Sequence, residues 1–247
     1  MRIDSYTLFG RWPYWEIKTK TAEDMLSLMD EYEIDKAAVI STRSIFLDYQ
    51  EGNGEVLDLM KRYSRRVIGI ATVNPKGKGE AKDDFHRSLE EGMRGIALFP
   101  LYHGYRLGAE PVLDTILAEA VERRMPILIP TRLLMNWTMP TLDGREARKL
   151  FSRFPEGRFL LMAVNREVDA LEAMRDHQNV SLETSCAQGA YAIERFIADF
   201  GIERVLYGSG LPLQYPGCGL AKIEGAEISE GEKEQIFSQN AMNLFGL

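Results

Sequence analysis

The sequence predicts one (β/α)8 barrel that spans residues 1–247 as a single domain. Three observations lead to this fold class. The chain has 247 residues, and about 250 residues is an ordinary length for a closed eight-stranded α/β barrel. Short apolar runs alternate with helical segments, and eight such runs are found. Runs that are apolar throughout are typical of parallel strands that helices cover.

The first four strands follow from apolar runs that end at strand-breaking residues. The runs are IDSYTLF, KAAVIS, RVIGIATV and RGIALF, and Asn74-Pro75 and Pro100 end the third and fourth. Thr21 with Asp24 makes a capping box at the start of the first helix. Strands are predicted at 2–9, 36–41, 66–73 and 94–99, and helices at 21–31, 55–63 and 79–91.

The second half repeats this pattern with shorter strands. The runs are PILI, RFLLMA, VSLE and RVLY, and the last run breaks at Gly208. Ser229 with Glu232 caps the closing helix. Strands are predicted at 126–129, 158–163, 180–183 and 204–207, and helices at 112–124, 145–154, 167–175, 190–200 and 229–245. The segments 42–54 and 131–144 are predicted to be irregular loops at the carboxyl ends of strands, where barrel active sites are built.

The composition argues against several classes of protein. A net charge of −7 disfavours nucleic acid and anionic membranes as partners, because both need a basic face. No apolar run approaches the roughly 20 residues that cross a bilayer, and the N-terminus lacks the apolar core of a secretion signal. Cys186 and Cys218 form no CxxC pair, so we expect thiols and a cytoplasmic protein. A nucleophilic Cys186 is the alternative to a buried thiol.

Six motifs occur in the order and at the spacing found in the amidohydrolase-related family. They are RGIALFP at 94–100, LDTILAEAVERRMPILIPT at 113–131, RFPEGRFLLMAVN at 153–165, NVSLETS at 179–185, RVLYGSGLP at 204–212 and ISEGEKEQIFSQNAMNLFGL at 228–247. Over most of its length the chain resembles this family, the group related to aminocarboxymuconate semialdehyde decarboxylase. The resemblance implies a barrel fold and hydrolase or lyase chemistry at a metal centre.

The positions at which the resemblance implies metal ligands hold other residues in this chain. The family supplies a D-x-H-x-H motif on the first strand, a histidine on the fifth and the sixth strand, and an aspartate after the eighth. The corresponding residues here are Tyr6, Leu8, Pro130, Ala163 and Gly210. A zinc or manganese site needs three or four converging donors, so we expect no metal and no cofactor. A metal hydrolase with misaligned ligands is the alternative, which the small number of histidines opposes: the chain has 3.

The predicted catalytic residues are His103, Tyr6 and Tyr105. His103 follows the fourth strand at the expected active face, and histidine alone titrates near neutral pH without help. Tyr105 lies nearby in sequence, and Tyr6 stands where the family places a metal ligand. The alternative for His103 is a loop histidine that hydrogen-bonds to the backbone. His86 and His177 are expected to be solvated.

Polar and charged residues at the predicted strand ends indicate an anion-binding mouth. Arginine forks match carboxylate geometry. The predicted substrate-binding residues are Arg11, Arg43, Arg132, Asn165 and Glu183. We therefore expect a small anionic ligand, with an aromatic acid or a sugar acid as examples. The alternative is that the arginines pair with acidic groups of the rim, namely Asp4, Glu183 and Asp143.

Two hypotheses from different functional classes follow. The first is an enzyme: a metal-independent hydrolase, lactonase or lyase that acts on a small carboxylate-bearing substrate. The second is a catalytically inactive barrel that binds a ligand or regulates a partner, because relaxed catalytic demand would leave the scaffold without its metal ligands. We favour the enzyme. For the oligomeric state the sequence offers only the commonest assembly of soluble proteins, a homodimer.

Overall fold

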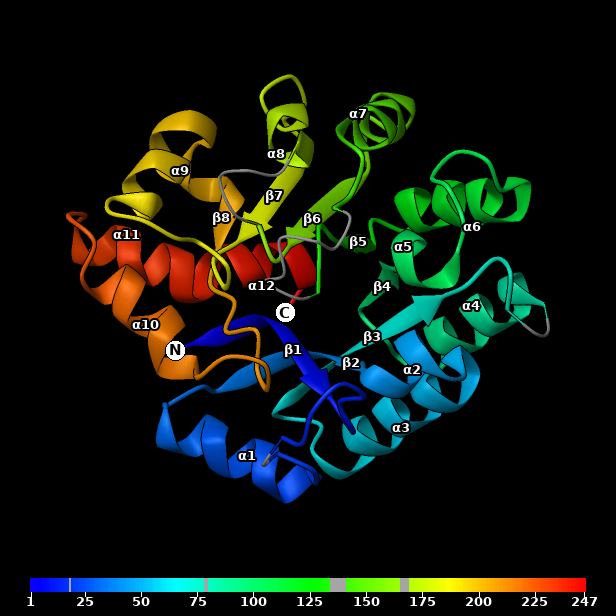
Figure 1. Ribbon diagram of the computed structural model, residues 1–247, viewed down its shortest axis with the longest axis horizontal. Coiled ribbons are helices and arrows are strands. Elements are labelled where there is room, and N and C mark those ends of the chain that lie inside the picture. The colour runs from blue at the N-terminus through cyan, green and yellow to red at the C-terminus, as the bar shows by residue number, and fades with distance from the viewer. Residues whose placement is uncertain (18, 78–79, 134–140, 165–168) are drawn as a thin grey trace.

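Eight parallel strands form one sheet in the order β1 to β8, and the helices surround it (Figure 1). The computed structural model describes residues 1–17, 19–77, 80–133, 141–164 and 169–247. The strands are β1 Ile3–Phe9, β2 Lys36–Ser41, β3 Val67–Val73, β4 Gly95–Leu98, β5 Pro126–Pro130, β6 Arg158–Met162, β7 Val180–Glu183 and β8 Val205–Leu206. The predicted (β/α)8 fold class is confirmed.

Backbone hydrogen bonds between β1 and the segment after β8 close the barrel. The N–H of Ser5 donates to the carbonyl of Tyr207 at 2.9 Å, and the N–H of Leu8 donates to that of Leu211 at 2.7 Å. β8 itself has only two residues, so this closure rests on few bonds.

The helices follow the strands as expected. They are α1 Ala22–Glu31, α2 Thr42–Phe46, α3 Tyr49–Arg62, α4 Ala81–Glu90, α5 Pro100–His103, α6 Pro111–Glu122, α7 Gly144–Arg153, α8 Asp169–Ala173, α9 Ala192–Phe200, α10 Pro216–Glu224, α11 Glu230–Glu234 and α12 Asn240–Phe245. Both predicted capping boxes are present, at Thr21 with Asp24 and at Ser229 with Glu232. The closing helix is continuous through a π-helical turn at Gln235–Gln239. In the described part of the chain, no helix has both the length and the apolar character needed to cross a membrane.

The prediction of an irregular loop at 42–54 was wrong, because this segment contains α2 and the start of α3. The Ser41 hydroxyl accepts the N–H of Arg43 at 3.0 Å and caps α2, and Asp48 caps α3. A glycine is needed where the two helices approach: a Cβ on Gly52 would lie 2.3 Å from the nitrogen of Ser44. Glycine-rich sequence disfavours a helix locally, and tertiary packing overrides that preference here.

The last strand was also predicted one residue too long at each end. Arg204 belongs to a 3-10 turn at Ile202–Arg204, and β8 begins at Val205. Its guanidinium is buried, and it donates to the carbonyls of Val180 at 2.6 Å, Met174 at 2.8 Å and His177 at 2.8 Å.

Arg204→Lys is expected to lower the free energy of unfolding by about 2 kcal/mol, because a single ammonium group cannot reach the carbonyls that the guanidinium fork serves. Urea denaturation measures this loss. Arg66→Lys is the matched control, since Arg66 also donates to two backbone carbonyls but is partly exposed. Equal losses in the two variants would contradict the prediction.

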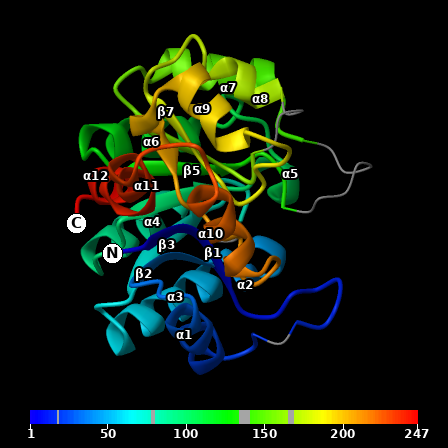
Figure 2. The same ribbon diagram turned by 90° about the vertical axis from the view of Figure 1, so that its left-hand side faces the viewer.

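Two apolar clusters lie on either side of the strands. The outer cluster packs the helices against the sheet and includes Tyr105 and Tyr207. The inner cluster fills the inside of the barrel and includes Ile3, Tyr6, Leu8, Trp12, Ile40, Phe99, Leu128, Leu133, Leu160, Met162, Cys186 and Leu206. Both termini lie at one end of the barrel, and the loop after β1 extends at the opposite end (Figure 2). Because the strands are parallel, their carboxyl ends lie at the end of the barrel where this loop extends, away from the two termini.

Candidate functional site

Buried carboxyl and hydroxyl groups meet between β1, the end of β7 and the segment after β8. We call Asp4, Glu183, Ser185 and Ser209 the carboxylate cluster. Each of these four residues is at most 1% exposed. Glu183 packs directly on the backbone after β8: a Cβ on Gly208 would lie 2.1 Å from its Oε2. Only glycine fits this position. The glycine of the RVLYGSGLP motif therefore allows Glu183 at the end of β7 to approach the backbone that follows β8.

Asp4 joins β1 to the segment after β8. Its carboxylate accepts the N–H of Tyr6 at 3.1 Å, the hydroxyl of Thr7 at 2.8 Å and the N–H of Ser209 at 2.9 Å. The hydroxyl of Ser209 donates to it as well. Burial raises the pKa of Asp4, and the hydrogen bonds from Ser209 oppose that rise.

Glu183 and Ser185 form a carboxyl–hydroxyl pair. The Ser185 Oγ–H donates to Oε1 of Glu183 at 2.8 Å, and the Ser185 N–H donates to Oε2 at 2.5 Å. The N–H of Ala163 also donates to Oε1. Burial raises the pKa of Glu183 to about 7, while hydrogen bonds from Ser185 and Ala163 lower it and the charge of Asp4 raises it. This carboxyl therefore titrates near neutral pH.

Lys222 and Cys186 border this pair. Lys222 on α10 donates its Nζ–H to the carbonyl of Ser185 at 2.7 Å, and burial lowers its pKa. Burial and the charge of Glu183 raise the pKa of Cys186 to about 11, and Gln214 donates to its sulfur at 3.4 Å. Cys186 is thus a buried neutral thiol, which favours the structural interpretation over a nucleophile.

Tyr6 lies in the inner cluster beside this site. Its side chain is 2% exposed, and its hydroxyl has no hydrogen-bond partner among the residues that the structure describes. Burial, Cys186 and Glu183 all raise the pKa of Tyr6. The hydroxyl therefore stays protonated and is available as a donor.

His103 and Tyr105 lie together, with ring centroids 6.4 Å apart. The Nε2 of His103 lies 3.1 Å from the carbonyl of Ser44, which can only accept, so Nε2 carries the hydrogen. Burial lowers the pKa of His103, which makes the ring neutral at neutral pH. Tyr105 belongs to the outer cluster. The backbone contact was the alternative raised for His103, and the catalytic role of His103 and Tyr105 stays a prediction.

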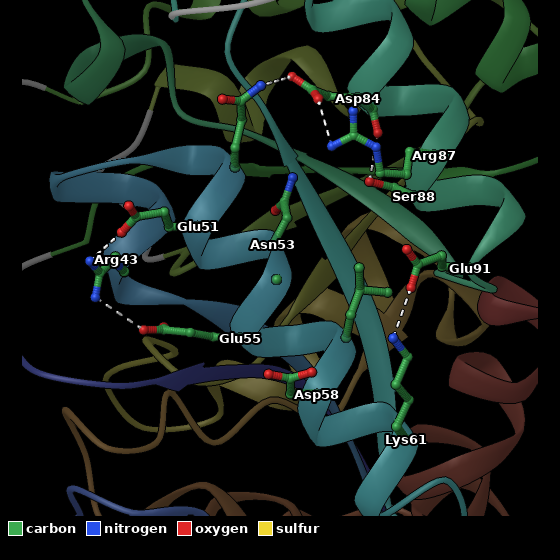
Figure 3. A pocket seen from close by; sticks show the side chains of 13 residues that line it. Arg43, Glu51, Asn53, Glu55, Asp58, Lys61, Asp84, Arg87, Ser88 and Glu91 are labelled. Atoms are coloured by element: carbon green, nitrogen blue, oxygen red, sulfur yellow. Dashed lines mark hydrogen bonds and ion pairs between the residues drawn. The ribbon is translucent and has the colours of Figure 1, made fainter.

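The predicted substrate-binding residues occupy different surroundings. Arg43 points toward Glu51 and Glu55 of α3 and pairs with both (Figure 3). This ion pair borders a pocket of about 530 Å³ between α3 and α4. Arg132 is buried at the end of β5, and Arg11 is exposed after β1. Asn165 lies outside the described residues.

The predicted alternative for the arginines, pairing with Asp4 and Glu183, is not found among the described residues. Both carboxylates instead accept hydrogen bonds from hydroxyl and backbone donors. Asp143 caps α7 by accepting the N–H of Arg145 at 2.7 Å.

Sequence reasoning missed Lys222 and the pairing of Ser185 with Glu183. Strand periodicity does not predict this pair, because β7 ends at Glu183 and Ser185 lies in the turn that follows. Lys222 belongs to no motif, and only the packing of α10 brings it to the site.

Fold and site together define a (β/α)8 barrel with titratable groups at the carboxyl ends of its strands. A family model described as Amidohydrolase matches residues 16–247, and the chain belongs to this family. Among curated proteins no match is found.

Solved structures with the same fold include two decarboxylases and a probable hydrolase. The 2,6-dihydroxybenzoate decarboxylase from Rhizobium is 14% identical with a TM-score of 0.78, over 99% of this chain and 98% of that one. The 5-carboxyvanillate decarboxylase from Novosphingobium aromaticivorans, solved with manganese, is 18% identical with a TM-score of 0.81, over 100% and 96%. A probable 2-pyrone-4,6-dicarboxylic acid hydrolase from Acinetobacter baumannii is 15% identical with a TM-score of 0.75, over 100% and 99%. At these identities the likeness concerns the fold.

The residues at the metal-ligand positions of the family do not fit a metal. These positions hold Tyr6, Leu8, Pro130, Ala163 and Gly210. A Cβ on Gly210 would lie 3.2 Å from Nε2 of Gln214 and 3.2 Å from Cβ of Ser185, so neighbouring side chains already fill that space. Across the described ranges, no group of three or more His, Cys, Asp or Glu side chains could hold a metal ion.

Proposed function

We propose that this chain is a metal-independent hydrolase that opens a lactone or ester bearing a carboxylate. The observation that carries the proposal is the 2.8 Å contact from the Ser185 hydroxyl to Glu183, whose pKa is raised to about 7. A hydroxyl within hydrogen-bond reach of a base is the arrangement of an activated nucleophile. A carboxyl that titrates near the working pH suits proton transfer.

The pair supports a balanced acyl-transfer sequence. Ser185 Oγ attacks the acyl carbon while its proton passes to Glu183. The bond from carbon to the leaving oxygen breaks, and that oxygen takes the proton from Glu183. Water then attacks the acyl carbon and gives a proton to Glu183. The bond to Ser185 Oγ breaks, and the serine takes the proton back.

Cationic groups near the strand ends favour a carboxylate substrate. Arg132 is buried at the end of β5, and Lys222 borders the pair. A guanidinium binds a carboxylate with two parallel hydrogen bonds. Members of the same fold act on carboxylates, as the names of the decarboxylases and of the probable pyrone-dicarboxylate hydrolase state. A lyase that decarboxylates a small carboxylate would need the same kind of substrate, although its reaction differs from the acyl transfer described above.

Ser185→Ala is expected to lower kcat for lactone opening at least about 100-fold, because it removes the nucleophile. The assay follows acid release from a panel that includes 2-pyrone-4,6-dicarboxylate, before and after treatment with a chelator. Ser238→Ala is the control, since Ser238 is equally buried but lies in the closing helix. Full turnover in Ser185→Ala, or loss of wild-type turnover on chelation, would show that the proposal is wrong.

A non-catalytic binding protein is the second candidate. The observation in its favour is that Glu183 and Ser185 are almost fully buried and that the inner cluster extends to Trp12, Leu133 and Cys186 beside them. On this hypothesis the protein opens none of the lactones, yet carboxylates raise its melting temperature by mass action. The proposed ligand is a small anion both for the hydrolase and for the binding protein. We also propose that the protein is cytoplasmic and forms a homodimer.

A further inference from the structure

Two buried hydrogen-bond donors of the inner cluster lack a protein partner. The hydroxyl of Tyr6 and the indole N–H of Trp12 have no acceptor in the described part of the chain. Their side chains are 2% and 6% exposed. Leaving a buried donor unsatisfied costs free energy, so native proteins rarely retain one without a reason.

The two donors belong to the same part of the barrel. Tyr6 lies on β1 and Trp12 in the loop that follows it, and both pack in the inner cluster. The ring of Trp12 packs edge-on against Phe46 at 5.3 Å, and Phe46 packs against Tyr102 at 5.7 Å. Tyr102 is among the groups that raise the pKa of Tyr6, after burial, Cys186 and Glu183. A series of aromatic contacts from Trp12 through Phe46 to Tyr102 therefore links the region of Trp12 to that of Tyr6.

The chemistry of the pair points to an acceptor. An indole N–H can only donate, and a protonated phenol donates one hydrogen. The carboxylate of Asp4, two residues before Tyr6, already accepts hydrogen bonds from Ser209 and Thr7. A carboxylate offers acceptors only, so its two oxygens complement two such donors.

We propose that Tyr6 and Trp12 donate hydrogen bonds to the carboxylate of the substrate and so determine which ligands bind. The inference rests on the proposed function, because it places the substrate beside β1, near Glu183 and Ser185. Arg132 contributes positive charge from the end of β5, and Leu133, the residue after it, belongs to the inner cluster. The pair orients the ligand, while Ser185 and Glu183 carry the chemistry.

Thermal denaturation with benzoate and with citrate tests this proposal. At least one probe is expected to raise the wild-type melting temperature in a concentration-dependent way. Tyr6→Phe is expected to bind that probe at least tenfold more weakly, and to be at least as stable as the wild type without ligand because it loses an unsatisfied hydroxyl. Tyr207→Phe is the matched control, since Tyr207 also has a buried hydroxyl without a partner among the described residues but lies in the outer cluster.

A second measurement does not depend on the stability of the variants. The chain has 3 tryptophans, and Trp12→Phe identifies the indole N–H signal of Trp12 in the wild-type NMR spectrum. Addition of the probe is expected to shift this signal downfield. If neither probe stabilises the wild type, or if Tyr6→Phe responds like the wild type and the Trp12 signal stays in place, the inference is overturned. The Ser185→Ala assay decides the proposed function separately, because it measures turnover.

Discussion

Glu183→Gln is expected to remove about 3 kcal/mol of pH dependence from the free energy of unfolding between pH 4.5 and about 7. In the folded chain the pKa of Glu183 is raised from 4.5 to about 7, chiefly by burial. Between these values the folded state keeps the proton and the unfolded state has lost it. The contribution of Glu183 is therefore complete below pH 4.5, falls as the pH rises, and is lost above about 7.

Urea denaturation at several pH values between 4.5 and 8 measures this effect. The stability of the wild type relative to Glu183→Gln should fall as the pH rises, because glutamine has no proton to release. Glu122→Gln, a change at an exposed position, serves as the control. Parallel curves for the wild type and Glu183→Gln would contradict the assigned environment of the carboxyl.

The same titration has a consequence for activity on the proposed mechanism. Turnover should rise with pH through about 7 as Glu183 becomes a base, and Glu183→Gln should lower kcat at pH 8 at least about 100-fold. A wild-type rate that does not change across this range would remove Glu183 from the chemistry while leaving its effect on stability intact.

Asp4→Ala is expected to lower the free energy of unfolding by about 4 kcal/mol. The change leaves the N–H of Tyr6, the hydroxyl of Thr7 and both donors of Ser209 without their acceptor. These donors are buried and cannot turn to water. They also lie at the closure between β1 and the segment after β8, where few backbone bonds hold the barrel together.

Urea denaturation again gives the free energy. Ser209→Ala is the graded comparison, since it keeps the Asp4 carboxylate and removes only the Ser209 hydroxyl, which donates to Asp4 and accepts the N–H of Leu211, and about 2 kcal/mol of loss is expected. A loss below about 1 kcal/mol in Asp4→Ala would mean that the backbone bonds alone close the barrel.

Much of the fold was predictable because its signals are local. The apolar runs and the residues that end them predicted all eight strands, and Thr21 and Ser229 marked two helix starts. The failure at 42–54 has a long-range cause. Asn53 of α3 donates to the carbonyl of Thr72 at 2.9 Å and accepts its N–H at 2.8 Å. The sequence around Asn53 does not predict that contact.

The candidate site was predictable only in part. Glu183 and Tyr6 were chosen from their strand positions, and the structure buries both, Glu183 as the last residue of β7 and Tyr6 in the middle of β1. Arg43 was chosen in the same way, yet it pairs with Glu51 and Glu55 on the outside of the barrel. A residue type and a strand end do not specify which way a long side chain turns.

The sequence by itself determined the barrel and which residues stand where the resemblance implies metal ligands, because strand patterns and residue identities are properties of short segments. Only the tertiary structure decided how the polar groups pair. Asp4 and Ser209 are 205 residues apart, and Lys222 reaches Ser185 from another helix. Such contacts depend on barrel closure and on the burial that shifts each pKa, and both arise only when distant strands pack together.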